Sequence, residues 1–342
     1  MFPAQMPQTD ADELLRCKDS SHSMVEEQKS QNENTKTDID LLHEVDHALW
    51  RDAAFRATDY DNIDVQVRDG IVHLNGHASS LTNLHQAERS LQTIPGLRGV
   101  NNHLIPDDQL LAEVSTALGS LESAYDCKFF TGVSHGVVLV SGNVENKNIK
   151  LLAEKCAASN PNVRGVINSI RTPGDDLNSL EEPFMQPIID EEIFFHDGIS
   201  GTVQQVIINP DNRRVVAMTL RGRFENQRQE LKSLNNGETR PAERTIILSM
   251  NSVRYLTKVS GFLYINSNEK NRYMDFDSTY FFTPKKDWKA PYPYCPDDVL
   301  FLIEPQDVKD QILQQFPESQ ILMGLKDQLL REQLPANDSL GG

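Results

Sequence analysis

The chain has 342 residues, of which 38% are hydrophobic and 24% charged, a composition typical of a soluble globular protein with some disordered segments. Its length accommodates about two or three domains. Its formal net charge of −17 disfavours bulk binding to nucleic acid or to anionic lipid. No run of residues approaches the roughly 18 apolar residues that a membrane-spanning helix needs.

The charge is unevenly spread along the chain. Residues 173–200 contain eight acidic side chains and no basic one, whereas residues 201–295 carry a net charge of +6. The basic segment could bind an acidic partner or pair with its own acidic neighbours, and the second interpretation is favoured because faces of mixed charge are common. Its candidate binding residues are Arg213, Arg214, Arg221 and Arg223.

The N-terminal sequence and the cysteines predict a cytoplasmic protein. Met1–Asp12 has neither the basic start nor the apolar stretch of a secretory signal. The four cysteines show no metal-binding or redox spacing, so we expect buried or free thiols. Residues 1–37 are polar and rich in Gln, Asn, Ser and Glu, which predicts a disordered leader.

Residues 38–107 predict the order helix, strand, strand, helix, strand. The first helix has one apolar stripe, and alternating residues from Ile63 to Val67 are typical of a half-buried strand. Asp69-Gly70 is a strong hairpin signal, and a second helix is stopped by Pro95-Gly96 before the last strand. Residues 108–172 repeat this order. The apolar stripe of the first helix is Leu41, Leu42, Val45, Ala48 and Leu49.

The two segments are copies of one unit, 66 residues apart. Residues 70–102 align with residues 136–168 without a gap, which indicates a tandem repeat. The shared glycines are expected to be turns that define the fold, so any ligand preference should lie where the copies differ. These glycines are Gly70, Gly76 and Gly99 in the first copy and Gly136, Gly142 and Gly165 in the second.

The repeated residues resemble the BON domain. They comprise a Gly–x–Val–x–Leu/Val–x–Gly hairpin, an Ala-Glu pair on the next helix, and Pro–x–x–Arg-Gly-Val before the last strand. The resemblance implies an αββαβ fold in each copy and a binding role without catalytic residues. It further implies a phospholipid or envelope surface, or a small ligand, as the bound partner.

An acidic linker, residues 173–190, precedes a segment with the pattern of a β domain, residues 191–270. Its strands flank the turn Asn209–Asn212, and a polar insertion, Glu225–Glu243, is expected to be a long loop. Gly–x–Val, the Asn/Asp-rich turn, Arg-Arg-Val-Val-Ala and the later strand pair resemble the PRC-barrel over about Met185–Ser267. This resemblance implies docking to a protein or ribonucleoprotein partner, with no chemistry.

Residues 271–306 are expected to form an extended strap that contains the aromatic and proline-rich stretch Trp288–Pro296. A polyproline ligand for a partner's groove is the alternative. Residues 307–334 predict a helical tail, whose apolar stripe could dock on the protein itself, form a homodimer or lie on a membrane. Self-docking and dimerisation are favoured because the tail is not basic. The stripe consists of Ile321, Leu322, Leu325, Leu329 and Leu330.

Two motifs are typical of hydrolases. His43, Glu44 and His47 read H-E-x-x-H, the zinc-protease spacing, but the histidines lie opposite the apolar stripe and have no counterpart in the second copy. Ser134 lies in a G-x-S-x-G match, which requires a strand-to-helix turn and here falls on a strand-to-strand hairpin. We therefore interpret both as surface features. His73, His77 and His103 occur only in the first copy and are expected to be surface or satisfied core residues.

The sequence thus predicts an α+β protein: two αββαβ units, a small all-β domain and a helical C-terminal tail. The favoured function is a non-enzymatic adaptor, whose repeated units bind a ligand, lipid or surface and whose β domain docks a protein partner. We expect no catalytic residue, metal or cofactor and no DNA binding. The alternatives are a cytoplasmic small-molecule sensor with its pocket between the copies and, remotely, a zinc-dependent hydrolase using His43, Glu44 and His47.

Overall fold

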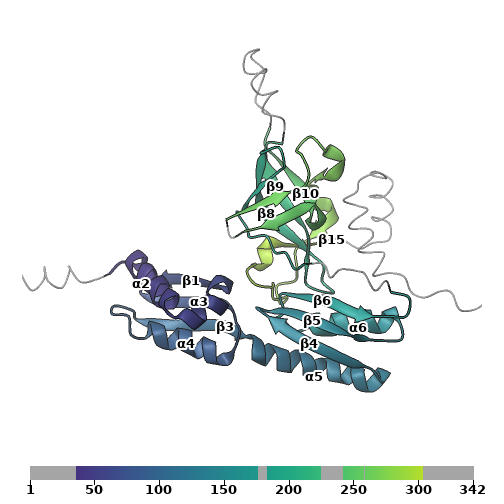
Figure 1. Cartoon of the computed structure of the whole chain (residues 1–342). Coiled ribbons are helices and arrows are strands. Elements are labelled where there is room, and N and C mark those ends of the chain that lie inside the picture. Colours follow the sequence, from purple (N-terminus) through teal and green to yellow (C-terminus); the bar gives the residue numbers. More distant parts are fainter. Residues whose placement is uncertain (1–35, 176–182, 225–241, 258, 303–342) are drawn as a thin grey trace, which may run out of the picture. The chain divides into compact units, whose positions relative to one another are not determined.

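The structure, a computed structural model, describes residues 36–175, 183–224, 242–257 and 259–302 (Figure 1). The helical tail predicted at residues 307–334 lies outside the described residues, as do nearly all of the predicted leader, most of the insertion at 225–243 and part of the acidic linker. Two compact units are distinguished, one of residues up to Asn75 with Thr82–Leu104, the other of Gly76–Leu81 and the chain from Ile105 onward.

The first repeat copy has the predicted order of elements. Helix α2 is capped by Thr37, whose hydroxyl accepts from the backbone N–H of Asp40 while the Asp40 carboxylate accepts from the N–H of Thr37, a capping box. The predicted stripe is confirmed, since Leu41, Val45 and Leu49 are buried. A short helix, α3, was not predicted. The elements are α2 (Asp38–Arg51), α3 (Ala53–Thr58), β1 (Ile63–Arg68), β2 (Ile71–Ala78), α4 (Leu81–Leu91) and β3 (Gly99–Pro106), with the strand order β1-β2-β3.

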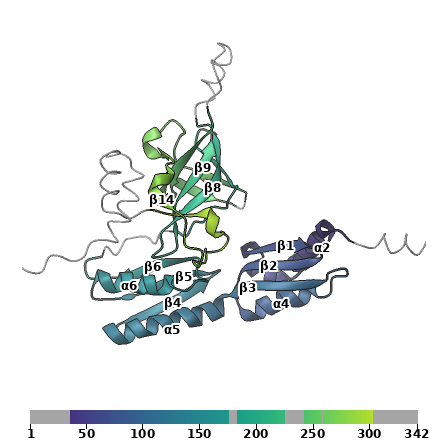
Figure 2. The same cartoon turned by 180° about the vertical axis from the view of Figure 1, so that it is seen from behind.

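The second copy repeats this order around a core of its own (Figure 2). Strand β4 pairs antiparallel with β5, and β5 pairs parallel with β6. The apolar sides of α5 and α6 pack on one face of this sheet, through residues such as Leu110, Val114 and Ile149. The elements are α5 (Asp107–Tyr125), β4 (Lys128–Ser134), β5 (Val137–Asn143), α6 (Lys147–Ala158) and β6 (Gly165–Arg171).

The first residue of each copy's first helix holds that copy's hairpin turn. The Asp38 carboxylate accepts hydrogen bonds of 2.8 Å from both backbone N–H groups of the turn Asp69–Gly70. Asp107 accepts from both N–H groups of the turn His135–Gly136 in the same way. Because buried or half-buried N–H groups need acceptors, this aspartate ties helix to hairpin in both copies.

Two further repeated residues make the same contacts in both copies. The guanidinium groups of Arg98 and Arg164 donate to the first carbonyl of the hairpin turn, at 3.3 and 3.1 Å. The side-chain amides of Asn102 and Asn168 donate to a carbonyl of the facing helix, at 3.3 and 3.0 Å. The residues shared by the two copies therefore include polar side chains that hold the hairpin turn and the facing helix in place.

The repeated glycines occupy two kinds of position. Gly70 and Gly136 have φ of +71° and +77°, the left-handed region in which a side chain is strained. Gly76 and Gly142 also have positive φ. The φ angles of Gly99 and Gly165 lie outside this region, so their backbones do not require glycine.

The remaining strands form one sheet with a separate hydrophobic core. Strand β8 lies between β7 and β9, and the order continues to β11 on one side and to β13 on the other. Strands β8 and β9 lie on either side of the turn Asn209–Asn212, as predicted from the sequence. The strands are β7 (Glu192–Phe194), β8 (Ser200–Ile208), β9 (Val215–Gly222), β10 (Arg244–Ser249), β11 (Val253–Leu256), β12 (Ser260–Leu263), β13 (Met274–Asp275), β14 (Phe281–Phe282) and β15 (Val299–Leu302).

The segment predicted as an extended strap contributes strands to this sheet. Strand β13 pairs with β10, and β15 pairs parallel with β8 through Val299 opposite Val206. The stretch between them packs inward, since Tyr294 is buried and its hydroxyl donates to the Pro187 carbonyl at 2.5 Å. Residues up to Leu302 therefore complete the β domain. Short strands in an aromatic and proline-rich segment carry little periodicity, which is why the pattern did not reveal them.

Candidate binding surfaces

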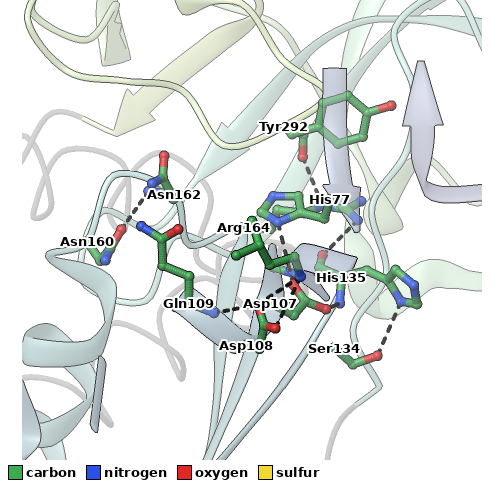
Figure 3. A network of polar contacts seen from close by, with 12 residues as sticks. His77, Asp107, Asp108, Gln109, Ser134, His135, Asn160, Asn162, Arg164 and Tyr292 are labelled. Atoms are coloured by element: carbon green, nitrogen blue, oxygen red, sulfur yellow. Dashed lines mark hydrogen bonds and ion pairs between the residues drawn. The ribbon is translucent and has the colours of Figure 1, made fainter. Parts of the chain in front are cut away.

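The hairpin of the second copy lies in a network of polar contacts that reaches the β domain (Figure 3). Besides the shared bond to the turn, the Arg164 guanidinium donates to the carbonyl of Tyr292 at 3.1 Å and to the side chain of Gln186. It also lies 5.3 Å from the centre of the Tyr292 ring. Burial lowers the pKa of Arg164 from its usual value. This arginine therefore joins the second copy to the β domain.

His77, at the end of β2, is buried against the same hairpin (Figure 3). Its ring covers Gly136 so closely that a Cβ on that glycine would overlap it. The Nδ1 atom lies 3.7 Å from the Asp107 carboxylate, which is too far for a hydrogen bond. Burial is the main cause that lowers the pKa of His77, which favours the neutral ring.

Of the four basic candidates, Arg213 is an internal anchor. Its guanidinium donates to the carbonyls of Val163 at 2.6 Å and Lys289 at 2.7 Å, and lies 4.9 Å from the centre of the Trp288 ring. Burial lowers its pKa to about 10. The side chain is 4% exposed, so it is inaccessible to a ligand.

The other three candidates are nearer the surface. Arg214 donates to the carbonyl of Pro183 at 2.9 Å, and Arg221 forms an ion pair of 2.8 Å with Glu243. Arg223 is exposed. Of the four candidates, Arg221 pairs with an acidic side chain and Arg213 and Arg214 donate to carbonyls, so pairing of the basic segment with its acidic neighbours stays a prediction.

The structure places one hydrolase motif on helix α2 and the other on the hairpin of the second copy. His43 and His47 are exposed on α2, and Glu44 forms an ion pair of 2.6 Å with Lys36. Within the described residues, no cluster of three metal-ligating side chains is found. Ser134 lies on the hairpin, 3.2 Å from Nδ1 of His135, and the nearby Asp107 carboxylate binds the His135 backbone rather than its ring. This geometry differs from a Ser-His-Asp triad, in which the carboxylate orients the imidazole.

Each repeat sheet has an open face, defined here as the face opposite its helices. In the second copy the residues at alternate positions of β4, β5 and β6 make up this face. Phe130 is 72% exposed there and Leu139 is 37% exposed. Leu139 pairs with Ile167, and Gly132 lies opposite Leu139 on the neighbouring strand. The face therefore presents apolar side chains next to Gly132, which has no side chain to cover the sheet.

The equivalent face of the first copy is polar. The positions 66 residues before Phe130, Leu139 and Ile167 are occupied by Asp64, His73 and Asn101. Along β1, polar side chains bond to one another, from Gln66 to Asp64 and from Arg68 to Gln66, both at 2.8 Å. Core positions are apolar in both copies, as with Val72 and Val138. One backbone thus presents two chemically different surfaces.

The fold is an α+β protein with a duplicated αββαβ unit and a β domain. Residues 46–105 and 131–174 match the BON domain family, so the chain contains two tandem BON units and this prediction is confirmed. No curated protein matches the chain. Among the described residues, no helix has the length and hydropathy to cross a bilayer.

Two solved structures are similar to part of the chain. Both come from CdsD, a structural protein of the type III secretion system of Chlamydia trachomatis. The first shows 12% identity and a TM-score of 0.30, and the match covers 39% of this chain and 59% of that one. The second, the C-terminal domain, shows 14% identity and a TM-score of 0.31, with 40% and 66% covered. The chain thus spans less than two thirds of either relative.

The sequence did not predict the contacts of Arg164 with the β domain, the burial of His77 against Gly136, or the apolar open face of the second copy. A signal for the face was present, because comparison of the copies at alternate strand positions separates core residues from residues that change character. Arg164 could not be found this way, since Arg98 occupies the same place in the first copy. One of its additional partners, Tyr292, lies 128 positions away in the sequence.

Proposed function

We propose that this protein is a non-enzymatic adaptor, whose two BON units present different binding surfaces on one fold. The observation that carries the proposal is the change of Asp64, His73 and Asn101 into Phe130, Leu139 and Ile167 on the open faces. Exposed apolar side chains that adjoin one another mark interaction sites more often than scattered ones do. The open face of the second unit then binds an apolar segment of a protein partner, and the polar face of the first unit contributes specificity.

The energy available at the second face is sufficient for specific binding. Full burial of one large apolar side chain stabilises a complex by about 1.5–3 kcal/mol. Because Phe130 is 72% and Leu139 37% exposed beforehand, their burial together contributes about 1.6–3.3 kcal/mol, which corresponds to roughly a 15- to 250-fold change in the dissociation constant. Aromatic residues in this position are typical of hot spots.

The experiment places a photo-reactive phenylalanine analogue at position 130 and, as a matched control, at the equivalent position 64. Irradiation in the native cell and mass spectrometry then identify the cross-linked proteins. We expect a discrete adduct from position 130 that is absent from position 64, because only the second face is apolar. Equal adduct patterns at the two positions would contradict the proposal, as would an apolar face that reacts with lipid alone.

The β domain is proposed to dock a second protein partner, in keeping with its resemblance to the PRC-barrel. A ladder of stacked rings supports this role: Tyr255 lies 4.8 Å from Phe262, which lies 5.4 Å from Phe194 on the next strand. Tyr255 is 44% exposed, so Tyr255→Ser should weaken this second interaction and leave adducts at position 130 unchanged. If Tyr255→Ser alters no interaction of the purified protein, docking through the ladder is wrong.

The proposal assigns the adaptor to the cytoplasm. Its support is that Cys127, Cys156 and Cys295 are free thiols in the described residues, as expected in a reducing compartment. Cell fractionation followed by thiol labelling tests the assignment. Recovery in an envelope fraction with oxidised cysteines would refute it.

A further inference from the structure

We infer that the C-terminal segment Ser319–Leu334 of the same chain occupies the open face of the second BON unit when no partner is bound. This inference rests on the proposed function, because it makes the adaptor's apolar surface a regulated one. Three observations support it: the chemistry of the face, the place where the chain leaves the β domain, and the pattern of the segment.

The open face lacks acidic residues, although the chain as a whole is strongly acidic. Its apolar centre is flanked at one end by Arg171, which is exposed, and by Lys128, which also pairs with Glu122 at 3.1 Å. At the other end Phe184 covers Gly165, since a Cβ there would lie 2.5 Å from the ring. The positions of the face are Lys128, Phe130, Gly132, Ser134, Val137, Leu139, Ser141, Asn143, Gly165, Ile167, Ser169 and Arg171.

The described chain ends toward the turn of the β domain that contacts the edge strand β6 of this sheet. Strand β15 runs parallel to β8, with Leu300 opposite Ile207, so Leu302 lies toward the same end as the turn that follows β8. In that turn the carbonyl of Asn212 accepts a hydrogen bond of 2.9 Å from the N–H of Val166. Val166 immediately precedes Ile167 of the open face. The chain after Leu302 therefore starts from the edge of the sheet that it is inferred to cover.

The length of the connection permits docking. Sixteen residues separate Leu302 from Ser319. An extended chain spans about 3.3–3.6 Å per residue, so this connection reaches on the order of 50 Å. Neighbouring strands are only about 4.8 Å apart, so a three-stranded sheet lies well within that reach.

The segment has the pattern that such a face would bind. Five of its aliphatic residues, from Ile321 to Leu330, recur at helical spacing and form one apolar stripe. Residues 319–334 carry two acidic and two basic side chains, a net charge of zero, so the segment brings no net charge to the face. The contact is therefore expected to be apolar, between the stripe and the exposed side chains of Phe130 and Leu139. A helix laid on the free side of a sheet is also a common layer arrangement, and here the opposite side already carries α5 and α6.

Photo-cross-linking of the purified full chain tests the inference. The reactive analogue is placed at position 130, or at position 64 as the control, and natural protein is mixed with protein of heavy isotopic label. We expect position 130 to cross-link to residues 319–334 within one molecule, and Leu325→Asp with Leu329→Asp to abolish that product. Adducts between light and heavy chains would instead establish a second copy as the occupant. The absence of any adduct to residues 319–334 would also overturn the inference.

A dye provides an independent readout. Full-length Leu325→Asp/Leu329→Asp should bind several-fold more 8-anilinonaphthalene-1-sulfonate than the natural chain, because the face is uncovered. Adding Phe130→Asp and Leu139→His should return dye binding to the original level. Unchanged dye binding in the tail variant would contradict docking. If neither the cross-linking nor the dye experiment shows docking of the tail, while position 130 still captures a partner in cells, the proposed adaptor function is retained and only the inferred regulation is wrong.

Discussion

Substitution of Gly136 by alanine tests the close contact between the hairpin of the second copy and His77. Two costs are expected. The φ of +77° is strained for any residue with a Cβ, which costs about 1–2 kcal/mol. The new methyl group would also overlap the His77 ring, and overpacking of a buried site costs about 1–3 kcal/mol more. The free energy of unfolding should therefore fall by about 2–5 kcal/mol.

Gly70→Ala is the matched control in the first copy. Its φ of +71° is nearly the same, but its Cβ would meet the side chain of Arg98 at 3.1 Å, and that flexible side chain can move. Only the conformational cost of about 1–2 kcal/mol should remain. The difference between the two variants therefore isolates the contribution of His77.

The two tryptophans allow each unit to be followed separately. Trp50 lies on α2 of the first unit, and Trp288 lies in the β domain of the second. Urea unfolding of Gly136→Ala is followed by Trp288 in a Trp50→Phe background, and Gly70→Ala by Trp50 in a Trp288→Phe background. A double-mutant cycle of Gly136→Ala with His77→Ala should yield a coupling energy of about 1–3 kcal/mol. Equal losses for both glycines together with zero coupling would refute the reasoning.

Three further outcomes are expected. Burial lowers the pKa of His77 in the folded state below its unfolded value of about 6.5, so the stability due to the neutral ring is complete above pH 6.5 and is lost as the pH falls. Unfolding free energies measured between pH 7.5 and 5 should show this loss. His77→Asn, which introduces the residue found at the equivalent position of the second copy, should make the pH-dependent loss smaller. Arg213→Gln should lower the unfolding free energy by about 2–4 kcal/mol, because charged hydrogen bonds to buried carbonyls are lost, whereas exposed Arg223→Gln should change it by less than about 0.5 kcal/mol, both measured by calorimetry. Asp38→Ala should cost the first unit about 1–3 kcal/mol in urea unfolding, since two turn N–H groups lose their acceptor; no loss would show that water replaces it.

Much of the fold could be predicted because the repeat supplied each element twice. Apolar periodicity located α2, and the Asp-Gly and His-Gly turns located both hairpins. Helix α5 begins at Asp107, one residue before the second copy was expected to begin, and extends to Tyr125. Its last turns still pack, because Leu121 lies against the core and the Glu122 carboxylate accepts a hydrogen bond of 2.8 Å from the N–H of Phe129.

The candidate surfaces were harder to predict than the elements. Arg213 resembled a free basic residue in a charged segment, yet its guanidinium is enclosed by carbonyls of Val163 and Lys289, which are distant in sequence. Charge counting cannot distinguish a buried cation from a solvated one. The open faces could be derived only once the strand register was known, because a shift of one residue exchanges the faces. Once the strand register is known, the contrast between Phe130 and Asp64 follows directly from the sequence.

The central claim is that the apolar open face of the second BON unit, and not its fold, selects the partner. The most direct measurement is the dissociation constant of the complex between this chain and the purified partner that was captured at position 130, determined by isothermal titration calorimetry. It is compared between the natural chain and a variant whose second face carries the first copy's residues, Phe130→Asp, Leu139→His and Ile167→Asn. The account predicts an interaction that is at least about 10-fold weaker, with unchanged unfolding of the second unit. An unchanged dissociation constant would contradict it.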